Sequence, residues 1–108
     1  MSQKEIKFKI TLDENKMPAQ IEWSADDADF EGEKAVQAMM IHLWDKDAKS
    51  SLNFELWTKD MLMQHMTVHY FYSLMSMADT YERATRNKTA ADMLRQFAHQ
   101  FAQATKEK

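Results

Sequence analysis

Two histidines in the second half of the chain have a spacing that could support metal chemistry. His65 and His69 are four residues apart, so on a helix their imidazoles lie on one face and can share a metal ion. The zinc-protease motif also requires a glutamate directly after the first histidine, and Met66 occupies that position. A small metal-dependent enzyme using this pair is one alternative. The plainer interpretation is two polar positions on a partly exposed helix.

The acidic segment of residues 26–33 imitates the start of a calcium-binding loop. Asp27, Asp29 and Glu31 stand at the first, third and fifth positions, and Gly32 at the sixth. The position that must supply a bidentate carboxylate falls on Ala38. A solvated acidic loop is therefore the favoured interpretation.

Other enzyme signatures fail on composition. The single glycine excludes a P-loop or a dinucleotide fingerprint. Ser73 follows His69 by four residues, but no oxyanion arrangement accompanies it. The absence of cysteine excludes a disulfide scaffold and a thiolate metal site. We therefore expect a protein that is not an enzyme and has no cofactor.

Charge and hydropathy limit the partners and the location. The net charge of -3 argues against generic nucleic-acid binding, which requires a basic face. No window approaches the roughly 20 apolar residues of a membrane-spanning helix, and the N-terminus shows no apolar signal-peptide core. We expect no nucleic-acid partner, no membrane-spanning segment and a cytoplasmic protein.

Period-two alternation predicts three strands. Residues 5–12 alternate strictly between apolar and polar side chains, and residues 13–18 contain turn formers. A second strand follows with Ile21 and Trp23 facing inward, and the two strands should form a hairpin. The third strand has Leu52, Phe54 and Leu56 on one face.

Helical spacing predicts three helices. Apolar pairs at residues 35/36, 39/40 and 43/44 form one stripe, which predicts a helix between the second and third strands. A long helix should cover residues 60–86. A last helix should begin at Thr89, which has capping-box spacing to Asp92.

These elements predict a single α+β domain over residues 1–108. The order is β-β-α-β-α-α, with a three-stranded antiparallel sheet in the order 2-1-3 and three helices packed on one face. The first strand, the longest and most regular, takes the middle place, which leaves the second and third strands with free edges.

One candidate partner-binding surface is centred on Trp57. If Leu52 and Phe54 face the core, alternation places Trp57 on the wet face beside a free edge, with Glu55 and Lys59 nearby. We expect self-association or partner binding there. The alternative is that the last helix or the acidic loop covers Trp57.

A second candidate surface lies on the long helix. It consists of mixed charges around Tyr81, namely Asp79, Glu82, Arg83 and Arg86. Its functional interpretation is a docking patch. Its structural interpretation is a solvated face with i,i+4 ion pairs from Asp79 to Arg83 and from Glu82 to Arg86.

Several blocks of the chain resemble, in order, the GldC family of gliding-motility-associated proteins. They are residues 56–61 and 76–85, together with residues 6–8, 12–16, 18, 21–25 and 44–45. The resemblance covers most of residues 4–86 and implies an accessory role in gliding motility and a cytoplasmic location, with no established reaction. We therefore expect a non-enzymatic accessory or adaptor protein that contacts proteins of the gliding machinery. The alternatives are the metal-dependent enzyme at His65 and His69 and a purely structural homo-oligomer.

Overall fold

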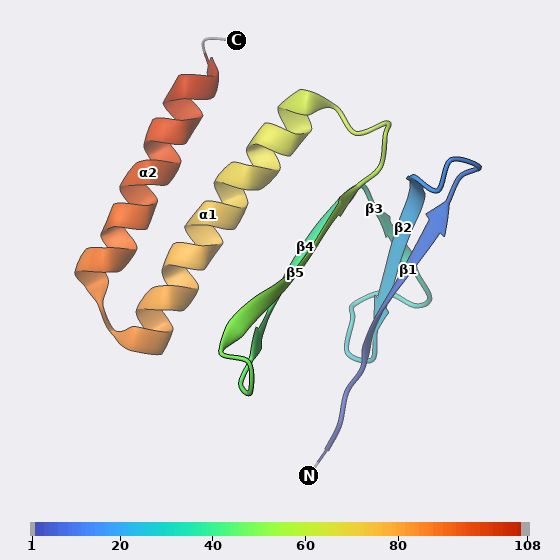
Figure 1. The fold of residues 1–108 in the computed structure, drawn as a ribbon, viewed down its shortest axis with the longest axis horizontal. Helices are drawn as coiled ribbons and strands as arrows, with labels where there is room; N and C mark the ends of the chain where they lie inside the picture. Colours follow the sequence, from blue (N-terminus) through green and yellow to red (C-terminus); the bar gives the residue numbers. More distant parts are fainter. Residues whose placement is uncertain (1, 107–108) are drawn as a thin grey trace. The chain divides into compact units, whose positions relative to one another are not determined.

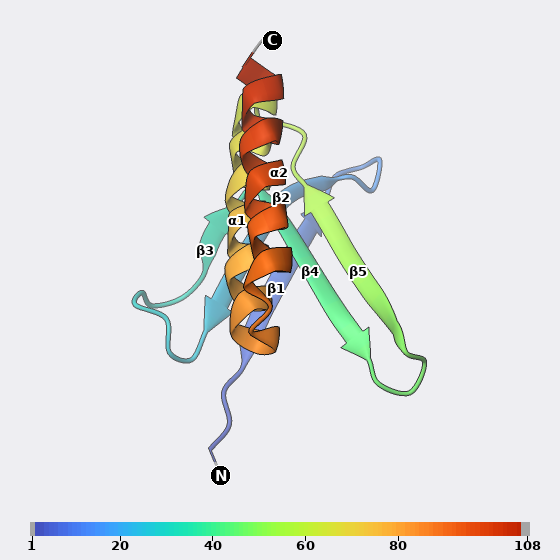
Figure 2. The ribbon, with the colours of Figure 1, turned by 90° about the vertical axis from the view of Figure 1, so that its left-hand side faces the viewer.

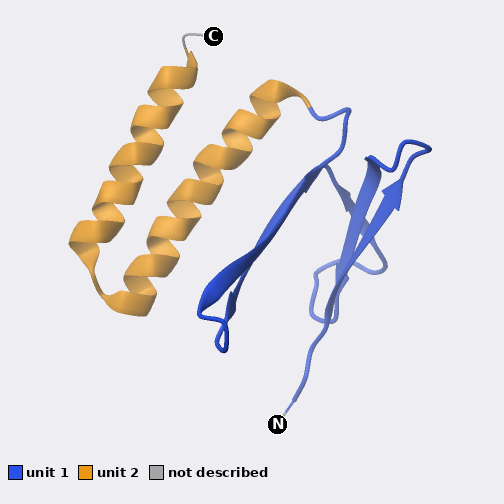
Figure 3. Ribbon diagram, viewed as in Figure 1, with its two compact units in different colours: residues 1–61 blue, residues 62–108 orange. Residues whose placement is uncertain are grey.

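The computed structural model describes residues 2–106, which form five strands and two helices (Figure 1). The elements are β1 (Ile6–Leu12), β2 (Pro18–Ala25), β3 (Lys34–Val36), β4 (Ala38–Asp45), β5 (Ser50–Trp57), α1 (Met63–Thr85) and α2 (Lys88–Lys106). The chain divides into two compact units, residues 1–61 with the strands and residues 62–108 with the helices (Figure 3). Whether the two units act as one domain over residues 1–108 stays a prediction.

The first sheet has the strand order β1-β2-β3, and all its pairs are antiparallel. The register places Ile21 of β2 between Ile10 of β1 and Val36 of β3. Ile21 is fully buried, and it is the largest side chain in the described chain with that property. Ile21 therefore lies at the centre of this sheet.

The second sheet is a hairpin of β4 and β5 (Figure 2). Its turn is held by Asp45, whose side chain accepts hydrogen bonds from the backbone N–H groups of Asp47 and Ala48 at 2.9 and 3.1 Å. At the other end the Thr58 N–H donates to the Gln37 carbonyl at 2.9 Å. Residues 34–36 therefore pair with β2 and residues 38–45 pair with β5, and Gln37 lies between these two segments.

The predicted helix around residues 35–44 is wrong, because this segment forms β3 and β4. Its apolar side chains are nearly continuous, and such a run fits helical and strand periods equally well. The turn after Asp45 places β5 alongside it, and pairing of Met39 with Leu56 and of Ile41 with Phe54 selects the strand. The described chain therefore has two helices, not three.

The predicted three-stranded sheet in the order 2-1-3 is also wrong. β3 takes the second side of β2, so β2 is central and β1 is at the edge. The predicted third strand is present as β5, but it pairs with β4 in a separate sheet. The class α+β is retained, since strands and helices occupy different parts of the chain.

The two helices form an antiparallel hairpin (Figures 1 and 2). Ala78 of α1 and Ala91 and Ala98 of α2 are fully buried, and small side chains let two helix backbones approach closely. α1 is continuous from Met63 to Thr85, and its C-cap Arg86 adopts the left-handed conformation with φ of 61°. Neither helix combines the length and apolar character needed to cross a membrane.

The cap of α2 differs from the predicted one. The Asn87 side-chain oxygen accepts a hydrogen bond from the Ala90 N–H at 3.0 Å, which is N-cap geometry. Thr85 supports this turn, because its Oγ1 donates to the Tyr81 carbonyl at 2.8 Å and accepts from the Asn87 N–H at 3.1 Å. Thr89, the predicted cap, lies inside the helix.

Candidate functional site

The β4–β5 hairpin presents two faces of different chemistry. Because directly opposed residues of an antiparallel pair share a face, the register separates the side chains into two sets. One face is wholly apolar between the ends of the strands and consists of Met39, Ile41, Leu43, Leu52, Phe54 and Leu56. The other carries Trp57 and Trp44 near opposite ends, with His42 and Glu55 between them. We call this second set the tryptophan face.

Both tryptophans of this face are exposed. Trp57 exposes 57% of its surface and Trp44 exposes 65%. Neither β4 nor β5 pairs with a further strand within residues 2–106. The expected exposure of Trp57 beside an unpaired edge is therefore present for β5. The free edge that was also expected for β2 is absent, because β2 has a strand on each side.

The charged residues expected near Trp57 have partners within residues 1–61. The Lys59 ammonium donates to Asp13 Oδ2 at 3.0 Å, which ties the end of β5 to the turn after β1. Glu55 Oε2 lies 3.6 Å from His42 Nε2 on the tryptophan face. Asp13 also accepts the backbone N–H groups of Met17 and Asn15, and the Met17 hydrogen bond and Lys59 lower the pKa of its carboxyl.

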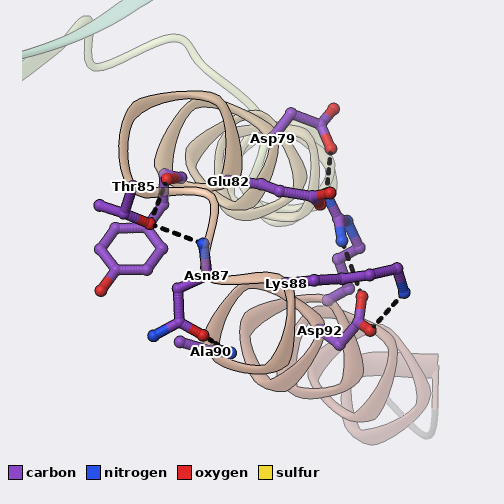
Figure 4. A network of polar contacts seen from close by, with 9 residues as sticks. Asp79, Glu82, Thr85, Asn87, Lys88, Ala90 and Asp92 are labelled. Carbon is purple, nitrogen blue, oxygen red and sulfur yellow. Dashed lines mark hydrogen bonds and ion pairs between the residues drawn. The ribbon is translucent and has the colours of Figure 1, made fainter.

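The helical hairpin holds a charge cluster centred on Arg95. Its guanidinium bonds Glu82 at 2.7 Å and Asp79 at 2.9 Å on α1, and Asp92 at 2.7 Å on α2. Asp92 also accepts from Lys88 at 2.8 Å, as Figure 4 shows with the neighbouring turn. Three carboxylates on one guanidinium make this a network that joins the two helices, and not a set of isolated pairs.

This network shifts the pKa of Asp92 and of Arg95. Hydrogen bonds from Lys88 and then from Arg95 lower the pKa of Asp92, since both favour the charged carboxylate. The pKa of Arg95 is raised by Glu82, Asp79 and Asp92, in that order. Asp92 and Arg95 are therefore both charged at neutral pH.

Arg95 changes the interpretation of the second candidate surface. The i,i+4 pairs expected within α1 do not form in the structure, because Asp79 and Glu82 both bond Arg95 of α2. Arg83 makes only a 3.4 Å contact with the Thr80 hydroxyl, and Arg86 occupies the C-cap of α1. Within residues 2–106 these two arginines have no carboxylate at ion-pair distance.

Tyr81, the centre of that expected patch, exposes 40% of its surface. It borders a shallow apolar hollow lined by Ala90, Met93 and Leu94 of α2. Arg83 and Arg86 line a different hollow, together with Asp79, Glu82 and Arg95, so the expected residues do not form one patch around Tyr81.

The histidine pair lies on α1, with His65 exposed and His69 half-buried. His69 Nε2 is buried and has no hydrogen-bond partner among the described residues. Within residues 2–106, no group of three or more histidine, cysteine, aspartate or glutamate side chains could hold a metal ion. In the acidic loop, Asp27 pairs with Lys4 at 2.7 Å and Asp26 accepts the Glu5 N–H at 2.9 Å, so two of its carboxylates bind protein groups.

Sequence reasoning missed Arg95 and Trp44 as surface residues. Trp44 was assigned to the stripe of a helix that does not exist. Arg95 carried a usable signal: in an antiparallel helix hairpin with a tight turn, residues equally far from the turn on either side lie opposite each other. Asp79 and Arg95 are such a pair about Asn87, as are Glu82 and Asp92.

Comparison with known proteins connects the chain to a biological process. The model of the family described as "Gliding motility-associated protein GldC-like" matches residues 18–107. The match includes the blocks at residues 56–61 and 76–85 and extends through α2, whereas β1 lies outside it. No curated protein and no solved structure matches the chain. The family description names gliding motility and no reaction, and because its model spans most of the sequence, the chain belongs to the GldC-like family of gliding motility-associated proteins.

Proposed function

We propose that the protein is a non-enzymatic adaptor of the gliding apparatus that binds a partner protein through the tryptophan face. The observation that carries this proposal is the exposure of Trp57 and Trp44 on the same face of a two-stranded hairpin. Tryptophan is enriched among residues that dominate binding energy, because it buries a large rigid surface at low entropic cost. Family membership supports proteins of the gliding machinery as the partners.

Polar groups on this face support a specific contact. Glu55 and His42 lie between the two tryptophans and offer a hydrogen-bond acceptor and a hydrogen-bond donor. Lys59 follows the strand, and its side chain is 69% exposed although it bonds Asp13. Such an arrangement of apolar anchors with polar groups nearby is typical of protein interfaces.

The hollow lined by Arg83 and Arg86 forms a second part of the proposal. Arg83 and Arg86 line this hollow and have no carboxylate at ion-pair distance among the described residues, so a partner that presents carboxylates could pair with them. In the same hollow, Asp79 and Glu82 bond Arg95. We infer that this hollow assists binding, and that the adaptor acts in the cytoplasm.

The experiment combines a gene deletion with complementation. Deletion should impair surface spreading and leave growth intact, and the wild-type gene should restore spreading. Trp57→Ala should fail to restore it and should lose the partner in a pull-down from gliding cells. Phe54→Ala is the matched control, because Phe54 lies on the same strand, has similar exposure and belongs to the opposite face.

Three outcomes would contradict the proposal. Normal spreading of the deletion strain would remove the motility role. A large loss of stability in Trp57→Ala without loss of the partner would show that Trp57 is a core residue. Self-association that Trp57→Ala abolishes, with no partner captured, would favour the structural homo-oligomer. Fractionation of cells should place the protein in the cytoplasm.

A further inference from the structure

The outer edge of β1 exposes a defined set of backbone groups. In the antiparallel pair of β1 and β2, the Asp26 N–H donates to the Glu5 carbonyl in the same register that pairs Lys7 with Ser24. Because hydrogen-bonded and non-bonded pairs alternate, the pairs at Lys7 and Lys9 are the bonded ones. The backbone groups of Ile6, Phe8 and Ile10 therefore point away from β2.

No strand takes up these outward groups within residues 2–106, since β1 is the end strand of its sheet. An unpaired edge of this kind is a template for a further strand. Ile6 exposes 61% of its surface and Phe8 42%, so the apolar face of the sheet continues to this edge. An added strand would extend that face with its own alternate side chains.

The opposite face of β1 carries two lysines. Lys9 is paired with Glu33 at 2.9 Å. Lys7 is exposed and has no carboxylate at ion-pair distance among the described residues. A strand added to the edge would place a side chain directly beside Lys7, and a carboxylate there would form a favourable cross-strand pair.

We propose that the free edge of β1 binds an extended segment of a partner protein in which apolar and acidic residues alternate. The outward backbone groups of Ile6, Phe8 and Ile10 supply the hydrogen bonds. The apolar residues of the segment join the face of Ile6 and Phe8, and an acidic residue pairs with Lys7. This site is separate from the tryptophan face and does not depend on the gliding role.

A second copy of β1 is a poorer occupant of the same edge. In the antiparallel register that overlaps two copies of β1 fully, Lys9 would stand opposite Lys9. Like charges placed directly opposite each other destabilise a strand pair. Lysines on edge strands commonly prevent such self-pairing. Here Lys9 disfavours another copy of β1, and Lys7 favours an acidic strand.

The test uses the full chain and two synthetic peptides of about ten residues. One alternates valine with glutamate, and the other alternates valine with lysine. Fluorescence anisotropy should show tighter binding of the glutamate peptide. Amide hydrogen exchange by NMR should show new protection at Ile6, Phe8 and Ile10, whereas the amides of Lys7 and Lys9 are already protected by β2.

Two variants separate charge from backbone pairing. Lys7→Glu should weaken binding of the glutamate peptide by roughly fivefold, as expected for one cross-strand charge pair, and should strengthen binding of the lysine peptide. Phe8→Pro removes an outward N–H without removing a bond to β2, and it should abolish binding of both peptides.

Several results would overturn the proposal. They are equal binding of the two peptides, no binding of either, or protection of amides outside β1. Concentration-dependent dimerisation with the same amides protected and no peptide present would make a second copy the occupant. Each of these results leaves the spreading assay unaffected, so failure here is distinct from failure of the adaptor role.

Discussion

Replacement of Ile21 by alanine tests the central position of β2. Ile21 is fully buried between Ile10 and Val36, and truncation of a buried isoleucine to alanine costs about 2–5 kcal/mol, because transfer energy is lost and a cavity remains. Ile6→Ala is the matched control, since it makes the same change on β1 at a side chain that is 61% exposed. Its cost should be about 1 kcal/mol or less.

Urea unfolding followed by tryptophan fluorescence measures both variants. All three tryptophans lie in residues 1–61, so this signal reports on the unit that contains Ile21. The free energies of unfolding in water follow from linear extrapolation, and an unchanged slope confirms that stability alone has changed. Equal losses for Ile21→Ala and Ile6→Ala would refute the reasoning, because they would mean that β2 is an edge strand like β1.

Four further predictions concern the helices, the histidine pair and the whole chain. Asn87→Ala should lower the free energy of unfolding by about 1 kcal/mol through loss of the α2 cap, whereas Thr89→Ala should be nearly neutral; equal effects in thermal melts would contradict the observed cap. Because the folded-state pKa of Asp92 is lowered, its contribution to stability is present above the ordinary value of 3.8 and is lost as the pH falls below it. Circular dichroism at 222 nm should therefore show acid loss of helix, and Asp92→Asn should flatten that dependence. Metal analysis of untagged protein should find no stoichiometric transition metal, and finding one would favour an enzyme at the histidine pair. If residues 1–108 are one domain, tryptophan fluorescence and helix signal should report the same unfolding midpoint, and separate midpoints would show two domains.

Local pattern was sufficient where a segment had one strong period. Strict alternation predicted β1 and the strand at β5, and the helical stripe predicted α1. The same alternation placed Trp57 on the face opposite Leu52 and Phe54. The expectation that these two side chains face the core is wrong, because each exposes 52% of its surface. The blocks that resemble the GldC family were likewise recognisable from the order of the residues alone.

Pairing between distant segments decided what local pattern left ambiguous. Residues 34–45 have an apolar run that fits a helix or a strand, and only their bonding to β2 and then to β5 selects the strand. Because residues 34–36 pair with β2, β2 is the central strand of its sheet and β1 has a free edge. Because residues 38–45 form a strand, Trp44 lies on an exposed face of the second sheet. Likewise, Arg83 follows Asp79 by four residues in sequence, yet Asp79 bonds Arg95, because the helix hairpin places Arg95 of α2 beside it. Sequence determined each element with a clear period, whereas tertiary structure decided the partners, since backbone hydrogen bonds and ion pairs form with whatever group the fold places within reach.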